Sequence, residues 1–226
     1  LSMTNLVSNA GVVASDQAAT TGTARRNLAA CEYGGDKGIF GFGEPGAASP
    51  TNLVSNAGVV ASDVAGVGTP RYAPGACEYG GDKGIFGYGD AGTLTAITNL
   101  VSNTGVVGSD VAGVGTPKEG PAACGYGGDK GIFGFGYKIA GGAASVSTTN
   151  LVSNAGVVAS DVAGVGTARK QLAATQYGGD KGIFAYGNTG SVTAITNLVS
   201  NTGVVASDQA AETGTARYGP AGCSFN

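Results

Sequence analysis

The sequence repeats itself along its whole length, and this feature limits the possible folds more than any other. The hexapeptide Thr-Asn-Leu-Val-Ser-Asn recurs at intervals of 47 residues, apart from one interval of 51. It begins at Thr4, Thr51, Thr98, Thr149 and Thr196. Units of this length are typical of arrays in which each unit buries its faces against its neighbours. We therefore expect residues 1–226 to form one domain, with units beginning near residues 4, 51, 98, 149 and 196.

Each unit contains four short stretches with strand character. In the first complete unit they are 29–33, 38–42, 51–55 and 58–62, and none has the length or the periodicity of a helix. The breaks between them are rich in Gly, Asp, Asn and Pro, which favour tight turns between antiparallel strands. The extra four residues of the long interval fall within 137–148 and indicate a loop insertion.

An all-β fold follows, and the unit size favours a β-propeller of four-stranded antiparallel blades, about 47 residues each. A β-solenoid is the competing array. The second block, Tyr-Gly-Gly-Asp-Lys-Gly-Ile-Phe, occurs only four times, at Tyr33, Tyr79, Tyr126 and Tyr177. This count predicts a five-bladed ring with one incomplete closing blade. A fragment of a larger ring and an oligomer of partial rings are the alternatives.

Composition excludes several classes of function. The chain has no His and no Trp, so histidine-based catalysis and zinc sites that use histidine are excluded. Its net charge of −3 and the lack of a basic stripe argue against nucleic acid as a partner, and no apolar run is long enough to insert into a membrane. No phosphate-binding or calcium-loop motif is present, so we expect no cofactor, no metal and no enzymatic activity.

Three sets of charged residues occupy equivalent positions in the units. We interpret them as structural, forming salt bridges between blades and Asp-capped turns; a ring of identical weak binding sites is the alternative. The first set is Asp16, Asp63, Asp110, Asp161 and Asp208, and the second is Arg25, Arg71, Lys118, Arg169 and Arg217. The third is the Asp-Lys pair that begins at Asp36, Asp82, Asp129 and Asp180.

The four cysteines also share one position in their units. They are Cys31, Cys77, Cys124 and Cys223, and Thr175 occupies the fifth place. Equivalent points around a ring are generally too far apart for a disulfide, so we expect free, buried thiols.

Two segments of each unit vary, and these are the candidate recognition residues. One follows the Thr-Ala/Pro-Arg/Lys motif, and the other follows the Gly-Phe/Tyr-Gly motif. Loops on a rigid scaffold commonly carry function, and an exposed tyrosine can stack on a sugar. The candidate ligand-binding residues are Tyr72, Tyr137, Tyr218, Arg26, Glu119 and Lys170.

The order of these motifs resembles a shortened blade of the kelch or regulator-of-chromosome-condensation type. The combination of Asn-Leu-Val-Ser-Asn with Asp-Lys-Gly-Ile-Phe-Gly-Tyr-Gly is also similar to glycine-rich tandem repeats in uncharacterised proteins of marine bacteriophages. The resemblance covers the whole chain. It implies a propeller, and a place on a virion or outside the cell.

Two hypotheses of function follow. The first is a non-enzymatic binding propeller, a multivalent module that recognises a cell-surface glycan or receptor and gains avidity from its repeated sites. The alternative is a purely structural repeat protein that self-associates through the edges of its incomplete blade.

Overall fold

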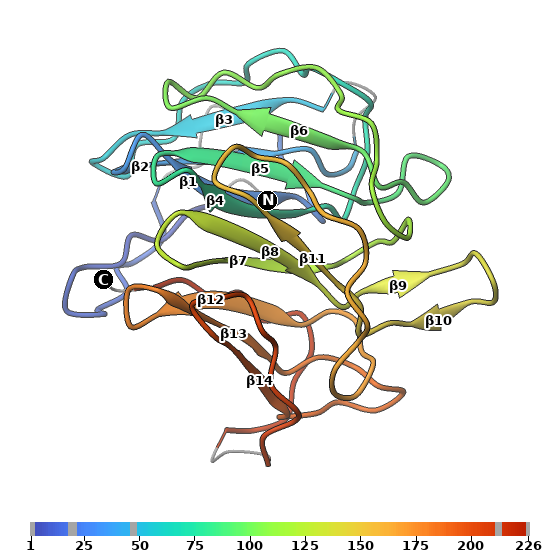
Figure 1. Ribbon diagram of the computed structural model, residues 1–226. Coiled ribbons are helices and arrows are strands. Elements are labelled where there is room, and N and C mark those ends of the chain that lie inside the picture. Colours follow the sequence, from blue (N-terminus) through green and yellow to red (C-terminus); the bar gives the residue numbers. More distant parts are fainter. Residues whose placement is uncertain (1–2, 18–21, 46–48, 211–213, 225–226) are drawn as a thin grey trace.

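The computed structural model is all-β over the residues that it describes, which are 3–17, 22–45, 49–210 and 214–224. Four antiparallel sheets of three strands each follow one another along the chain (Figure 1). The first two sheets are β1 (Ala29–Tyr33), β2 (Lys37–Gly41) and β3 (Thr51–Val54), then β4 (Gly75–Tyr79), β5 (Lys83–Gly87) and β6 (Thr98–Val101). The last two are β7 (Ala122–Tyr126), β8 (Lys130–Gly134) and β11 (Thr149–Val152), then β12 (Ala173–Tyr177), β13 (Lys181–Ala185) and β14 (Thr196–Val199).

A glycine turn sets the register of every sheet. In the first sheet, Tyr33 pairs with Lys37, and the turn between them places Gly34 and Gly35 at φ values of +63° and +78°. Only glycine adopts this backbone at low cost, which explains the Gly-Gly pair in each unit. The first of the expected strands is confirmed at its predicted bounds, and the next two lie within one residue of theirs.

The expectation of four-stranded blades is not met, because each sheet has three strands. The predicted fourth stretch, 58–62, is not a continuous strand: it meets β3 at the isolated bridge between Val54 and Val60 and through the Ala61 N–H, which donates to the Leu53 carbonyl. Just beyond this stretch, Val64 bridges Thr51. The side-chain amide of Asn52 donates to the Ala61 carbonyl, which a neighbouring backbone N–H would otherwise use. A side chain therefore interrupts the ladder in the middle of this pairing.

The hydrophobic core lies between successive sheets. One cluster joins the first and second sheets, and includes Tyr33, Ile39 and Phe86. Two further clusters join the second sheet to the third and the third to the fourth. The first strands β1, β4, β7 and β12 accordingly lie side by side in that order. The second and third sheets are apolar on both faces because each is covered by a neighbouring sheet on both sides.

The insertion predicted within 137–148 forms a separate hairpin. Its strands are β9 (Tyr137–Lys138) and β10 (Ala144–Ser145), which project from the stacked sheets (Figure 1). Gly141 and Gly142 lie in its turn at positive φ. The described residues contain no helix that is long and apolar enough to cross a membrane.

Candidate binding surface

The two variable segments of each unit lie opposite each other. Isolated bridges join Arg26 to Glu44, Tyr72 to Asp90, Glu119 to Tyr137 and Lys170 to Asn188. Each bridge continues the register of the hairpin beside it, because β1 and β2 begin to pair three residues further in, at Ala29 and Gly41. The variable residues therefore gather at the edge of the sheets that lies away from the Gly-Gly-Asp turns. We call this the loop edge.

The first two bridges are reinforced by polar side-chain contacts. Arg26 Nε lies 3.0 Å from Glu44 Oε1, and the Arg26 side chain is 79% exposed. The Tyr72 hydroxyl donates to Asp90 Oδ2 at 2.7 Å. This hydrogen bond to a carboxylate raises the pKa of Tyr72 to about 12. Tyr72 therefore remains a neutral hydrogen-bond donor at physiological pH.

The next two bridges meet around Tyr137. The ammonium of Lys170 lies 4.3 Å from the centre of the Tyr137 ring, a cation–π contact. Burial and the charge of nearby Asp90 raise the pKa of Glu119. The positive charge of Lys170 acts in the opposite direction and lowers it. Charged groups of three successive units are therefore close enough to influence one another. Together the bridged residues form one polar row along the loop edge.

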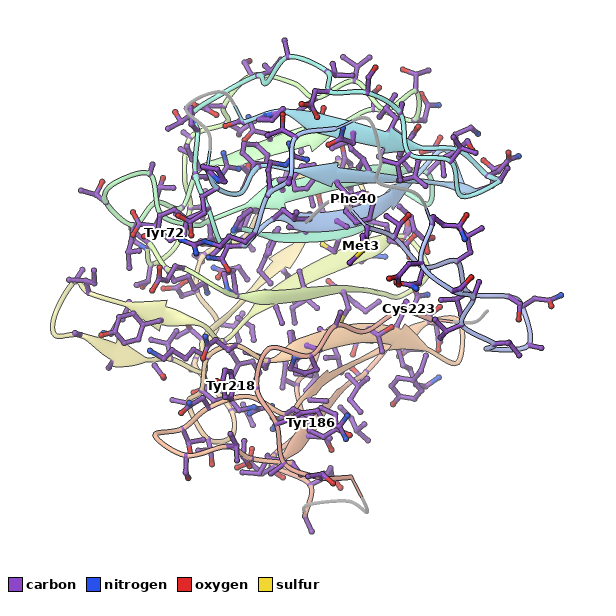
Figure 2. All side chains as sticks on the ribbon, turned by 180° about the vertical axis from the view of Figure 1, so that it is seen from behind. Met3, Phe40, Tyr72, Tyr186, Tyr218 and Cys223 are labelled. Carbon is purple, nitrogen blue, oxygen red and sulfur yellow. The ribbon has the colours of Figure 1, made fainter. Side chains whose placement is uncertain are left out.

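The predicted tyrosines differ in how much of the ring is accessible. Tyr218 is 58% exposed, whereas Tyr72 and Tyr137 are half-buried and engaged by Asp90 and Lys170. Figure 2 labels Tyr72 and Tyr218 among the side chains. The structure thus brings Tyr72, Glu119, Tyr137 and Lys170 together and leaves Tyr218 as the open aromatic surface. Sequence reasoning missed the role of Glu44, Asp90 and Asn188, although extending the hairpin register would have identified them.

Four aspartates of the first charged set, Asp63, Asp110, Asp161 and Asp208, join the segment before a sheet to the segment after it and do not form the expected salt bridges. Asp63 accepts hydrogen bonds from the backbone N–H and hydroxyl of Thr23 and from the amide of Asn52. These bonds lower the pKa of Asp63. Asp110, Asp161 and Asp208 bind Thr69, Thr116 and Thr167 in the same way. Within the described residues, no ion pair joins an aspartate of this set to a cation of the second.

Four cations of the second set lie over aromatic rings of the preceding unit: Arg71, Lys118, Arg169 and Arg217. Arg71 lies 4.0 Å from the centre of the Phe42 ring, and Arg169 lies 4.2 Å from that of Phe135. Both guanidinium groups also donate to a backbone carbonyl through Nε. Lys118 is fully buried, contacts Tyr88 and donates to Asn150. The three buried cations, Arg71, Lys118 and Arg169, fasten one unit to the next and are not available to a ligand.

The Asp-Lys pairs lie at the Gly-Gly-Asp turns, at the opposite edge of the sheets. Asp82 and Lys83 form an ion pair of 2.7 Å, and Asn103 donates to the same aspartate. The same edge carries one strongly exposed valine per unit, about 65% in each case. These valines are Val12, Val59, Val106, Val157 and Val204.

A cavity of about 590 Å³ is lined by the first strands of all four sheets and by the C-terminal segment 222–224. The four cysteines are free, as expected. Cys77 and Cys124 are buried, and burial raises the pKa of Cys124 to about 12. Cys223 is exposed, which corrects the expectation that all four thiols are buried. Its exposure arises because, within the described residues, no complete sheet follows β12–β14.

No family model matches this chain, and a search of curated proteins finds no significant match.

Proposed function

We propose that this chain is a non-enzymatic binding protein whose loop edge recognises a cell-surface glycan or receptor. The observation that carries the proposal is the continuous polar row at that edge. It combines an exposed guanidinium at Arg26, hydrogen-bonding pairs such as Tyr72 with Asp90, and the open ring of Tyr218. Fixed hydrogen-bonding groups beside an aromatic face match the hydroxyls and the apolar face of a sugar.

The scaffold in this proposal is a propeller with the units arranged around the cavity. Two observations support it: the four first strands and segment 222–224 line one cavity, and each predicted fourth strand bridges its β3 equivalent. The pairs along the row differ from unit to unit, which favours one extended ligand over identical separate sites. The resemblance to phage repeats favours a position on a virion or outside the cell.

A glycan array tests the proposal, using the intact chain at several concentrations. We expect a defined set of glycans to bind, and Tyr218→Ala and Arg26→Ala each to weaken binding at least tenfold. Lys83→Ala is the matched control, because it removes a charge from the turn edge and leaves the loop edge unchanged. An equal loss in Lys83→Ala, or no saturable binding to glycans or to intact cells, would refute the proposal.

A further inference from the structure

Three junctions between successive sheets share one construction. The phenylalanine of each following middle strand (Phe86, Phe133 or Phe184) packs against a glycine of the preceding one (Gly41, Gly87 or Gly134). A Cβ on these glycines would come within 2.7 to 2.9 Å of the ring. All three rings also contact the aromatic residue that follows the glycine: Phe42, Tyr88 and Phe135.

The first and fourth sheets each have one face without such a junction. Phe40, the equivalent phenylalanine of the first sheet, is only half-buried, whereas Phe86, Phe133 and Phe184 are fully buried. On the fourth sheet, Tyr177 is 36% exposed, against about 5% for its equivalents. Neither face is covered by another sheet in the described part of the chain.

These two faces border one site, which we call the open position. The cavity lining includes Phe40 of the first sheet, Thr175 of the fourth and Cys223 between them. Figure 2 shows Phe40 and Cys223 on the side of the molecule away from the β9–β10 hairpin. The N-terminal segment 4–17 reaches the first sheet from this side, because Leu6 contacts Gly58 as Leu53 contacts Gly105. Counterparts of the first and third strands are thus present, and a middle strand is missing from the described residues.

We propose that the open position is a docking site for one extended strand from a second polypeptide, with the sequence pattern Gly-aliphatic-aliphatic-Gly-aromatic. A strand is the appropriate occupant because, at each of the three existing junctions, a middle strand fills the corresponding place between two sheets. Within the described residues, β2, β5, β8 and β13 are each already paired on both sides in their own sheets, so we assign the strand to a second polypeptide. This proposal is independent of the loop-edge function.

Both glycines of the pattern follow from contacts at the three existing junctions. The first glycine would lie against Thr175, as Gly84 lies against Cys31. A Cβ added to Gly84 would come within 2.5 Å of the Cys31 Sγ, so only glycine fits there. The second would receive the ring of Phe40, as Gly41 receives Phe86. The aromatic residue would lie below Arg25. Among the arginines that precede the described sheets, Arg71 and Arg169 contact a ring of the preceding unit, whereas Arg25 has no such contact in the described residues. Nε of Arg25 is buried without a hydrogen-bond partner.

Ala185 determines the second aliphatic position. It replaces the glycine found at the other three junctions, and its methyl group occupies the place where a phenylalanine ring would pack. In the repeat's own Gly-Ile-Phe-Gly-Tyr strand, the phenylalanine ring would clash with the methyl group of Ala185. A leucine at the same position is shorter and would end before it reaches that methyl group. The occupant is consequently related to the repeat but distinguishable from it.

Two labelled peptides test the proposal against the intact chain by fluorescence anisotropy. The first has the sequence of residues 79–90, Tyr-Gly-Gly-Asp-Lys-Gly-Ile-Phe-Gly-Tyr-Gly-Asp, and the second differs only by leucine at the position of Phe86. We expect the leucine peptide to bind at least tenfold more tightly. Ala185→Gly should remove this preference by strengthening binding of the phenylalanine peptide, and binding should slow thiol labelling of Cys223.

Controls separate this site from the loop edge. Tyr218→Ala should leave peptide binding unchanged, whereas Phe40→Ala should weaken both peptides; its circular dichroism spectrum confirms that it folds. Saturable binding of neither peptide, or the same preference in Ala185→Gly as in the natural sequence, would overturn the proposal. A mass that doubles with concentration in the absence of peptide would also overturn it, because the occupant would then be a second copy of this chain.

Discussion

Single buried cations connect the units of this protein, and Lys118 differs chemically from the arginines at its equivalent positions. It is fully buried, with a tyrosine ring and an amide oxygen as its contacts. Burial lowers its pKa to about 8, and Asp161 offsets this only in part. An arginine remains charged throughout the accessible pH range, so Arg71 and Arg169 provide the same packing without titrating.

Stability should therefore rise with pH through the titration of Lys118. Above pH 8 the folded state releases a proton that the unfolded state retains up to its ordinary pKa near 10.4, so the folded state is favoured. Relative to Lys118→Arg, the natural chain should gain about 2 kcal/mol between pH 7 and pH 9.5. Urea unfolding of both proteins in matched buffers measures this difference. A constant difference over that range would show that Lys118 keeps its ordinary pKa.

Backbone strain at one repeat position provides a second prediction at this scale. Ala73 and Gln171 adopt φ values of +49° and +56°, where the equivalent residues Gly120 and Gly219 pay little for the same conformation. Ala73→Gly should therefore stabilise the protein by about 1 kcal/mol, whereas the same change at Ala76 in β4 should destabilise it. Thermal unfolding of the two variants tests this, and a loss of stability in both would indicate that Ala73 is unstrained.

At the scale of the element, each sheet is held by a short turn at one edge and an aspartate at the other. Asp110 accepts from the N–H and hydroxyl of Thr69, 41 residues earlier in the chain, and from Asn99. These bonds join the segment before β4 to the segment after β6. Asp16 occupies the equivalent sequence position, but within the described residues its side chain accepts a hydrogen bond from Asn5 alone.

The two aspartates provide a matched pair of variants. Asp110→Asn replaces charge-assisted hydrogen bonds with weaker ones and should destabilise the protein by about 1–2 kcal/mol. Asp16→Asn should change stability by less than about 0.5 kcal/mol, because the site is exposed and lies in a single hairpin. Chemical unfolding gives both values, and equal losses would contradict a specific role for the Thr69 contact.

The elements also show how far the sequence can predict this structure. The Gly-Gly-Asp turn favours one hairpin register, so the strand at 29–33 was predicted at its bounds and the strand expected at 38–42 lies one residue earlier, at 37–41. Extending the same register would also have identified the bridge between Arg26 and Glu44. The stretch expected as a fourth strand does not form one, because the Asn52 side-chain amide donates to the Ala61 carbonyl that a continuous strand pairing would use. Strand propensity gives no sign of this competition. The stacking of Arg71 on Phe42 depends on how two sheets meet, and residues 29 apart in sequence carry no local signal of it.

At the scale of the whole molecule, the described residues form four similar three-stranded sheets with three similar cores between them, so stability depends on contacts between neighbours. The glycines of the turns take part in these contacts through their backbone N–H groups. The N–H groups of Gly34, Gly80 and Gly127 each donate to an aspartate carbonyl of the following sheet at 2.7 Å. Gly178 has the same place in the fourth sheet and a similar φ, but no such partner in the described residues.

Hydrogen exchange at Gly127 and Gly178 therefore measures whether the fourth sheet is covered. The amide of Gly127 should exchange at least tenfold more slowly in the native state, because its hydrogen bond must open first, whereas Gly178 is available to water. Exchange followed by NMR on the isolated chain provides both rates, and the similar turn geometry makes them comparable. Equal protection would mean that a neighbouring strand already covers this face. If the leucine peptide then slows exchange at Gly178 and leaves Gly127 unchanged, the strand docks beside the fourth sheet, as the open position requires.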